Sequence, residues 1–204
     1  MNVINSEINQ SNCWEQAYKL ITEGKTSEAM QLCQRLPCAN DSVDCQRYLG
    51  WSFYDVDDTE KALYWFSKAV DKKDSESMYG IGCIHFIKRD FESAFSDYHT
   101  SLKWGYGRSA YWLGYMYEQG LGTDKNIHEA KRHYELGYEY GYLISKRASI
   151  NLVFKNGNFF QKLLSMPSLL YIIFRSMMIA KNDINDERLA DIPNAFNLNN
   201  NNSR

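Results

Sequence analysis

The chain has 204 residues, of which 44% are hydrophobic and 24% are charged. This length fits one sizeable domain or a short array of repeats, and the composition is that of an ordinary globular protein. The formal net charge is −2, so no general attraction to nucleic acid or to anionic lipid is expected. Only three prolines occur, which leaves room for long uninterrupted helices.

The beginning of the chain carries no recognisable targeting segment. Residues 1–11 have neither a basic stretch nor an apolar core, so we expect a flexible N-terminus and no secretory signal. Five cysteines without such a signal indicate free thiols in a reducing compartment. Cys33, Cys38 and Cys45 lack the tight C-x2-C pair that zinc sites usually show. The expected location is cytoplasmic, or peripheral to the inner face of a membrane.

A repeat of 32 residues runs through the middle of the chain. Each unit begins with an aliphatic–glycine pair, and the pairs are Leu49–Gly50, Ile81–Gly82 and Leu113–Gly114. The offsets are 81 − 49 = 32 and 113 − 81 = 32 residues. Ala62 and Ala94 follow their pairs by thirteen residues, but Ala130 follows by seventeen, which indicates a four-residue insertion in the third unit. An aromatic residue stands four positions after each alanine, namely Phe66, Tyr98 and Tyr134.

These spacings place the recurring residues on one face of a helix. A large residue such as Phe66 then meets a small one such as Gly50 on the neighbouring helix, so the two axes can approach closely. The breaks between helical stretches contain Asp or Thr, which are favourable N-caps. The sequence therefore predicts an all-α fold, a right-handed α-solenoid of about five helix-turn-helix repeats over residues 12–157, with an extra hydrophobic C-terminal helix.

The repeat resembles the tetratricopeptide pattern, in which L-G-x2-Y is followed by A-x3-F and a further alanine. The stretch 112–137 resembles the Sel1-like variant of that family, and the matching residues are Ala110, Leu113, Gly114, Tyr117, Gly120, Gly122, Ala130, His133, Tyr134, Gly137 and Gly141. The two earlier units lack the glycine loop, and no unit has the closing proline. The resemblance covers residues 13–157 and implies an adaptor scaffold that holds partner proteins in a concave groove, without catalysis.

Two motifs that invite a chemical interpretation do not satisfy its geometry. His128 and His133 bracket Glu129, but a spacing of five residues puts the two rings about 140° apart on a helix. They cannot share a metal as in H-E-x-x-H, so His133 is expected to pack between helices. The stretch 120–123 lacks the Lys-Ser/Thr pair of a phosphate loop and is interpreted as a plain loop. We therefore predict no catalytic residue, no metal, no cofactor and no enzymatic activity.

The first helix of each pair would line the concave face of the solenoid. Trp, Tyr and Arg, which dominate binding hot spots, are frequent at those positions. The predicted partner-binding residues are Arg47, Trp51, Tyr54, Tyr79, Phe86, Arg108, Tyr111, Tyr115 and Glu118. The alternative is that several of them only pack against the next repeat.

The segment 158–182 is unusually apolar. Pro167 fits the first turn of a new helix. The candidate docking residues are Leu169, Leu170, Ile172, Ile173, Phe174, Met177 and Ile179. On a helical wheel, Leu170, Ile173 and Met177 form a stripe suited to packing on the repeats, whereas Ile172 and Ile179 intrude on the polar side, out of reach of the repeats. Because a capping helix normally has a polar outer face, additional cover is expected.

Three kinds of cover remain open for this helix: a protein partner or second copy of the chain, an interfacial contact with a membrane, or a full span. Lys162, Pro167 and Arg175 interrupt the run of about twenty apolar residues that a span requires. The sequence predicts a non-enzymatic interaction protein, with a membrane-peripheral accessory protein docking through residues 159–181 as the alternative. Residues 183–204 are polar and are expected to be disordered.

Overall fold

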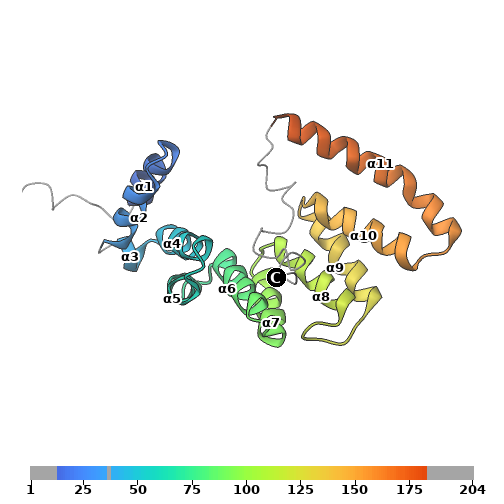
Figure 1. Ribbon diagram of the computed structural model, residues 1–204, viewed down its shortest axis with the longest axis horizontal. Helices are drawn as coiled ribbons and strands as arrows, with labels where there is room; N and C mark the ends of the chain where they lie inside the picture. Colours follow the sequence, from blue (N-terminus) through green and yellow to red (C-terminus); the bar gives the residue numbers. More distant parts are fainter. Residues whose placement is uncertain (1–12, 36–37, 183–204) are drawn as a thin grey trace, which may run out of the picture. The chain divides into compact units, whose positions relative to one another are not determined.

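The computed structural model describes residues 13–35 and 38–182 (Figure 1). Within these ranges the chain forms α-helices and no β-strand. The predicted flexible N-terminus, residues 1–11, and the predicted disordered tail, residues 183–204, lie outside the described residues. The chain divides into two compact units, one up to Ile84 and one from His85 onward, and each is described by itself.

The first unit is built from helical hairpins. Its helices are α1 (Cys13–Thr22), α2 (Thr26–Gln34), α3 (Cys38–Asp41), α4 (Val43–Asp55), α5 (Thr59–Val70) and most of α6 (Ser75–Ile87). Helices α1 and α2 pack as one pair, and α4 and α5 pack as another. The core between α1, α2 and α4 consists of Cys13, Ala17, Ala29, Leu32, Cys33, Cys45 and Leu49.

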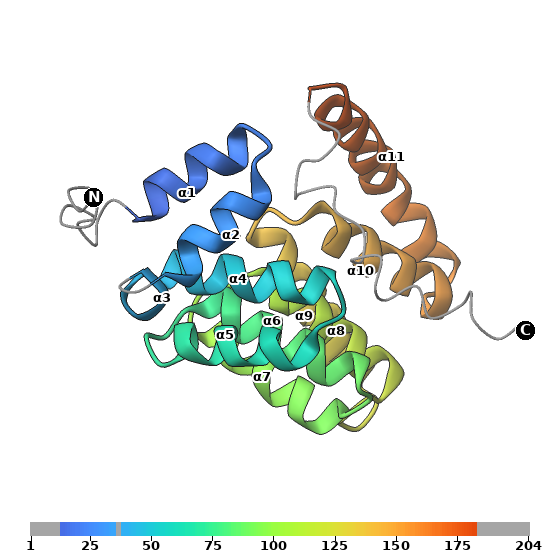
Figure 2. The ribbon, with the colours of Figure 1, turned by 60° about the vertical axis from the view of Figure 1, so that its left-hand side comes forward.

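The second unit continues the same arrangement. After the end of α6 come α7 (Phe91–Lys103), α8 (Arg108–Gln119), α9 (Ile127–Glu139), α10 (Leu143–Asn156) and α11 (Phe159–Asn182). From α7 onward each helix packs against the next one along the chain. Figure 2 shows α11 running beside α10 at the end of this series. The extra C-terminal helix that the sequence predicts is therefore present.

Small residues meet aromatic rings inside the hairpins, as predicted. A Cβ atom on Gly50 of α4 would lie 2.4 Å from the Phe66 ring of α5. In the second unit, a Cβ atom on Gly114 of α8 would lie 2.6 Å from the Tyr134 ring of α9. The same contact thus recurs at equivalent repeat positions, 114 − 50 = 64 residues apart. The packing confirms an α-solenoid built from tetratricopeptide-like hairpins.

Acidic residues cap the helices at the predicted breaks. Asp58, Asp74 and Asp90 each accept a hydrogen bond from the backbone N–H three residues later, at 3.1, 2.8 and 3.2 Å. In the third sequence repeat the cap is Asn126, whose side chain accepts hydrogen bonds from two backbone N–H groups at 3.1 Å each. These bonds satisfy amides that a helix start leaves without an intrahelical partner.

Residues with a left-handed backbone conformation follow the ends of successive helices at a regular spacing. The backbone φ is +60° at Asp57, +62° at Lys73 and +61° at Arg89. The spacings are 73 − 57 = 16 and 89 − 73 = 16 residues, half of the sequence repeat. Gly105 continues the series with φ +102°. Only glycine adopts this conformation without steric strain, so three of these turns are strained by their side chains.

The start of α11 differs from the prediction. Pro167 lies inside a continuous helix from Phe159 to Asn182 rather than in the first turn of a new one. The helix begins eight residues earlier because Asn158 and Gln161 cap each other. The Asn158 backbone N–H donates to Gln161 Oε1, and the Gln161 N–H donates to Asn158 Oδ1, both at 2.9 Å. This reciprocal pair is a capping box, and it outweighs the signal from Pro167.

Candidate interaction surfaces

Three of the predicted groove residues are interior packing residues. Tyr54, Tyr79 and Phe86 are buried. The first two lie against the Trp51 ring, with centroid distances of 5.3 and 6.0 Å. The Phe86 ring lies 5.0 Å from that of Trp112. Burial leaves these side chains no surface for direct contact with a partner. They pack inside the protein, which is the alternative interpretation that the sequence left open.

The exposed part of the predicted groove in the first unit is a cluster that we call the α4 patch, comprising Asp44, Arg47, Trp51, Asp74 and Glu76. The Trp51 indole N–H donates to Glu76 Oε1 at 3.0 Å. Arg47 Nη1 donates to Asp74 Oδ1 at 2.5 Å, and Arg47 also pairs with Asp44 and Glu76. One arginine among three carboxylates leaves a formal charge of −2. These bonds hold a half-exposed indole ring in one orientation on an acidic surface.

The exposed part in the second unit lies on one side of α8, and this α8 face consists of Arg108, Tyr111, Tyr115 and Glu118. All four side chains are half-buried, and their spacing of three or four residues aligns them along the helix. Glu118 is held by two donors, the Tyr134 hydroxyl at 3.0 Å and Lys155 Nζ at 3.2 Å. Burial raises the pKa of the Tyr134 hydroxyl above its ordinary value, so it remains a donor to Glu118.

Trp51 and Tyr115 occupy the same position in two repeats, because 115 − 51 = 64 is twice the repeat length. Each is half-exposed and rests on a buried aromatic ring. The Trp51 ring lies 5.0 Å from Phe66, and the Tyr115 ring lies 5.9 Å from Trp112. The first helix of each of the two repeats thus carries an amphipathic aromatic side chain at the same repeat position, and this side chain packs against a buried ring.

His128 and His133 of the third sequence repeat lie in different surroundings. His133 is buried, and its Nδ1 lies 3.0 Å from the Glu129 carbonyl oxygen. Its ring contacts those of Tyr117 and His99 at 5.2 and 5.8 Å, and burial lowers its pKa. His128 is exposed. His133 therefore packs between helices, as predicted, and no group of three metal-ligating side chains occurs in the described part of the chain.

The cysteines correct one prediction. Cys13 is disulfide-bonded, whereas Cys33, Cys45 and Cys83 are free and buried. The expectation that all thiols are free is therefore wrong for Cys13. The spacing of cysteines along the chain could not show this, because a disulfide depends on which sulfur atoms the folded helices bring together.

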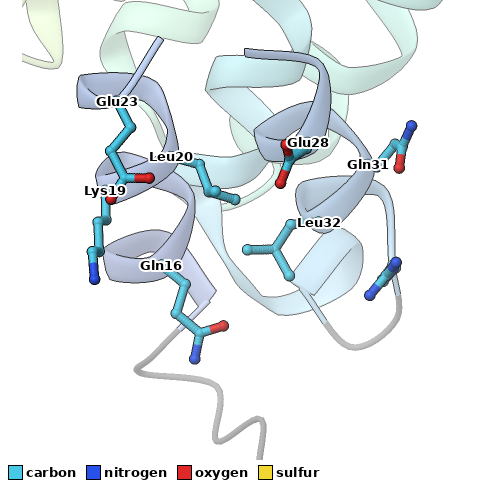
Figure 3. A pocket seen from close by; sticks show the side chains of 8 residues that line it. Gln16, Lys19, Leu20, Glu23, Glu28, Gln31 and Leu32 are labelled. Carbon is cyan, nitrogen blue, oxygen red and sulfur yellow. The ribbon is translucent and has the colours of Figure 1, made fainter. Parts of the chain in front are cut away.

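A hollow lies between α1 and α2 in the first unit (Figure 3). Leu20 and Leu32 face each other across it, and polar side chains surround them. The lining residues are Gln16, Lys19, Leu20, Glu23, Glu28, Gln31, Leu32 and Arg35. Both charge signs are present, and no nucleophile stands beside a general base. The hollow therefore lacks the arrangement that covalent catalysis requires.

The C-terminal helix turns the opposite side toward the protein from the one predicted. Ile172 is only 3% exposed and clusters with Leu143 and Ile150 of α10. Leu170 and Met177, predicted to pack on the repeats, are 63% and 67% exposed. The prediction that Ile172 faces away from the repeats is therefore wrong. Leu169 and Ile179 pack against the same cluster, so the contact of α11 with α10 is apolar.

Of the candidate docking residues, Leu169, Ile172 and Ile179 face α10, and Leu170, Ile173, Phe174 and Met177 are exposed. By length and composition alone, one helix in the described ranges, Phe159–Lys181, is apolar enough to cross a membrane. Its most apolar stretch of 18 residues has a mean hydropathy of 1.6, and 6% of that stretch is buried. Whether such a helix crosses a membrane or lies on its surface depends on where its polar side chains lie.

Comparison with protein-family models gives a match to the Sel1 repeat over residues 43–74 and 107–142. The matched segments have 74 − 43 + 1 = 32 and 142 − 107 + 1 = 36 residues. The two lengths differ by four residues, which equals the insertion inferred for the third sequence repeat. The period, the register and the longer loop are thereby confirmed.

Comparison with curated and solved proteins gives relatives of the same type. Over 76 residues the chain is 34% identical to the ERAD-associated E3 ubiquitin-protein ligase component HRD3 of Candida glabrata. This match covers 36% of the chain but spans only 9% of the length of HRD3.

Two solved structures share the fold. A Sel1 repeat protein from Oxalobacter formigenes superimposes with a TM-score of 0.63 at 21% identity, covering 74% of this chain and 62% of the other. MamA superimposes with a TM-score of 0.61 at 17% identity, covering 79% and 96%.

Proposed function

We propose that this chain, which is a tetratricopeptide-like repeat protein of the Sel1 variant, is a non-enzymatic adaptor that binds a partner protein. Sel1 repeats typically mediate protein–protein interaction and are generally non-enzymatic scaffolds. The relative HRD3 is by its name one component of a ubiquitin-protein ligase. A role as one member of a larger assembly is therefore proposed here as well.

The observation that carries the proposal is the repeated aromatic position on the first helices. Trp51 and Tyr115 are partly buried, occupy equivalent repeat positions and pack against buried rings. A ring that is already held in place loses little conformational entropy when a partner covers it, which favours binding. Each of the two positions would bind a side chain of a partner segment.

The charge of the α4 patch indicates the chemistry of that partner. The patch holds three carboxylates and one arginine. Arg47 pairs with Asp44, Asp74 and Glu76, and Glu76 also accepts the hydrogen bond from Trp51. A partner segment with lysine or arginine next to an apolar or aromatic residue would match both the acidic surface and the indole. The α8 face, with Tyr111 beside Tyr115, would bind an apolar side chain of a partner.

A peptide selection tests this proposal without knowledge of the natural partner. Peptides selected from a random library against the full chain should be rich in basic and aromatic residues. Trp51→Ala should weaken their binding by about 30-fold, the effect of a hot-spot residue worth about 2 kcal/mol. Tyr64→Ala, which removes an exposed aromatic ring from a second helix, is the matched control and should leave binding unchanged.

Peptides that bind equally well to wild type and Trp51→Ala would place the binding surface elsewhere. Tyr115→Ala tests the α8 face in the same way. A selection that yields no binding peptide would contradict the scaffold function.

The predicted cytoplasmic location stays part of the proposal. The disulfide at Cys13 weighs against it, because disulfides are rare in cytosolic proteins. Cell fractionation combined with thiol labelling would decide: an unreactive Cys13 in a cytosolic fraction would support the proposal, and a secreted or luminal chain would contradict it.

A further inference from the structure

α11 exposes an apolar side, whereas a helix that caps a water-soluble repeat array exposes a polar one. With Ile172, which faces α10, set at 0° and 100° per residue, the serines at 165, 168 and 176 all fall within about 40° of it. The exposed residues Leu163, Leu170 and Phe174 fall within about 20° of the opposite direction, 180°. The side toward α10 therefore combines Leu169, Ile172 and Ile179 with serines, whereas the side toward the surroundings is apolar.

The apolar side is too wide for contact with a single helix. From Ile173 at about 100° to Leu164 at about 280°, no charged residue occurs between Phe159 and Ala180. This arc of about 180° exceeds the stripe of about 100° that a surface helix buries, and a two-helix seam is narrower still. A second α11 packed against this one would leave a large part of the arc in water. A continuous apolar medium would cover all of it.

Two of the three charged residues stand where a helix lying in a bilayer surface needs them. Lys162 at about 80° and Arg175 at about −60° flank the two edges of the arc, whereas Lys181, in the last turn of the helix, falls at about 180°. The helix contains no acidic residue, so its formal charge is +3. Side chains at such edges can extend to lipid headgroups while their methylene stems stay against the acyl region. Basic residues there complement anionic headgroups.

The packing against α10 decides between lying on the bilayer and crossing it. Ile172 clusters with Leu143 and Ile150 along α10, so the two helices are held side by side. A crossing α11 would carry α10 into the hydrocarbon region, together with Lys146 and its partner Glu135 of α9, which are 2.7 Å apart. Burying such groups in lipid is strongly unfavourable. An orientation in the membrane plane leaves α9 and α10 in water.

We propose that α11 docks in the plane of an anionic lipid bilayer, with Leu163, Leu170, Phe174 and Met177 in the acyl region and Lys162 and Arg175 at the headgroups. The repeats are thereby displayed above the membrane. This surface is separate from the α4 patch and the α8 face, so the two proposals can fail independently.

Co-sedimentation of the full chain with lipid vesicles tests the proposal. Wild type should bind vesicles of phosphatidylcholine mixed with phosphatidylserine. The variant Leu170→Gln/Phe174→Gln/Met177→Gln should lower the partition coefficient by more than about 100-fold, because three apolar side chains lose their burial. Its helix content and melting midpoint should not change, since these side chains are exposed. The matched control Tyr18→Gln/Val56→Gln/Tyr64→Gln removes three exposed apolar side chains elsewhere and should bind like wild type.

A second variant isolates the charge contribution. Lys162→Gln/Arg175→Gln should weaken binding to the mixed vesicles by about fivefold for each residue. Binding to vesicles of phosphatidylcholine alone should change little. Equal losses on both vesicle types would contradict the assignment of these residues to anionic headgroups.

Tryptophan reporters on α11 distinguish the in-plane orientation from a span. Phe160→Trp and Phe174→Trp lie on the exposed side, fourteen residues or about 21 Å apart along the helix. After subtraction of the wild-type signal, brominated lipids should quench both reporters to the same extent and at the same shallow depth. Depths that differ by most of that distance would indicate a span and overturn the proposal.

The remaining outcomes also overturn the proposal. Wild type that does not bind the mixed vesicles, or a Leu170→Gln/Phe174→Gln/Met177→Gln variant that binds them unchanged, would contradict it directly. A dimer in solution that this variant dissociates, without vesicle binding by wild type, would show that a second copy of the chain covers the face.

Discussion

Helices α9 and α11 are both amphipathic, but they turn opposite sides toward the protein. α9 buries its apolar anchors and leaves Lys131 and Arg132 in water; the buried residues are Ala130, His133, Tyr134 and Gly137. α11 buries Ile172 against Leu143 and Ile150 of α10 and leaves its widest apolar side exposed. The comparison shows that two amphipathic helices can serve different purposes. The direction of the apolar side separates α9, which packs into the scaffold, from α11, whose exposed side is the basis for the proposed docking.

The largest expected effect comes from overpacking the interior of a repeat. Ala62 on α5 is fully buried. Ala62→Trp should lower the free energy of unfolding by about 3 kcal/mol, because the added ring has no space between the helices. Chemical denaturation followed by circular dichroism measures this. Tyr64→Trp on the exposed side of α5 is the control and should stay within about 0.5 kcal/mol of wild type. Equal stability of the two variants would contradict the repeat register.

An intermediate effect should separate the two sides of α11. Ile172→Ala removes a buried side chain from the contact with α10 and should cost about 2 kcal/mol in the free energy of opening α11. Leu170→Ala on the exposed side should change it by less than about 0.5 kcal/mol. Hydrogen exchange of the α11 amides in the full chain measures both. A larger loss for Leu170→Ala would restore the orientation that the sequence predicted and remove the basis for membrane docking.

The smallest effect concerns the turns of the repeats. Lys73→Gly should raise the stability by about 0.5–1 kcal/mol, because glycine adopts a left-handed conformation without strain. Asp57→Gly and Arg89→Gly should act alike. Asp71→Gly, two residues away with φ −56°, is the control and should not stabilise the chain. Thermal unfolding of the variants provides the comparison; stabilisation by Asp71→Gly but not by Lys73→Gly would contradict the strain assigned to these turns.

The repeat region could be predicted from the sequence because its contacts are local and recur. A glycine such as Gly50 and an aromatic such as Phe66 meet inside one hairpin, so their spacing along the chain fixes their contact in space. Helix starts at Asp58 and Asp90 follow the same rule, since a cap involves residues only three positions apart. Such short-range relations can be read directly from residue spacing.

The parts that could not be predicted depend on which surface a side chain meets. A wheel showed the two sides of α11 but not that α10 would accept the narrow side with Ile172. Tyr79 has a typical hot-spot side chain, yet neighbouring rings bury it. The start of α11 carried two competing signals, the Asn-x-x-Gln spacing of the Asn158–Gln161 capping box and Pro167, and the capping box sets the start.

The orientation of α11 is the central claim, and thiol accessibility tests it most directly. Leu170→Cys and Ile172→Cys place one new thiol on each side of the helix, while the free native thiols at 33, 45 and 83 are buried. In the full chain, a maleimide should label Leu170→Cys at the rate of an exposed thiol and Ile172→Cys at least about tenfold more slowly, the ratio expected when labelling requires a local opening of about 1.4 kcal/mol or more. Faster labelling of Ile172→Cys than of Leu170→Cys would contradict the account.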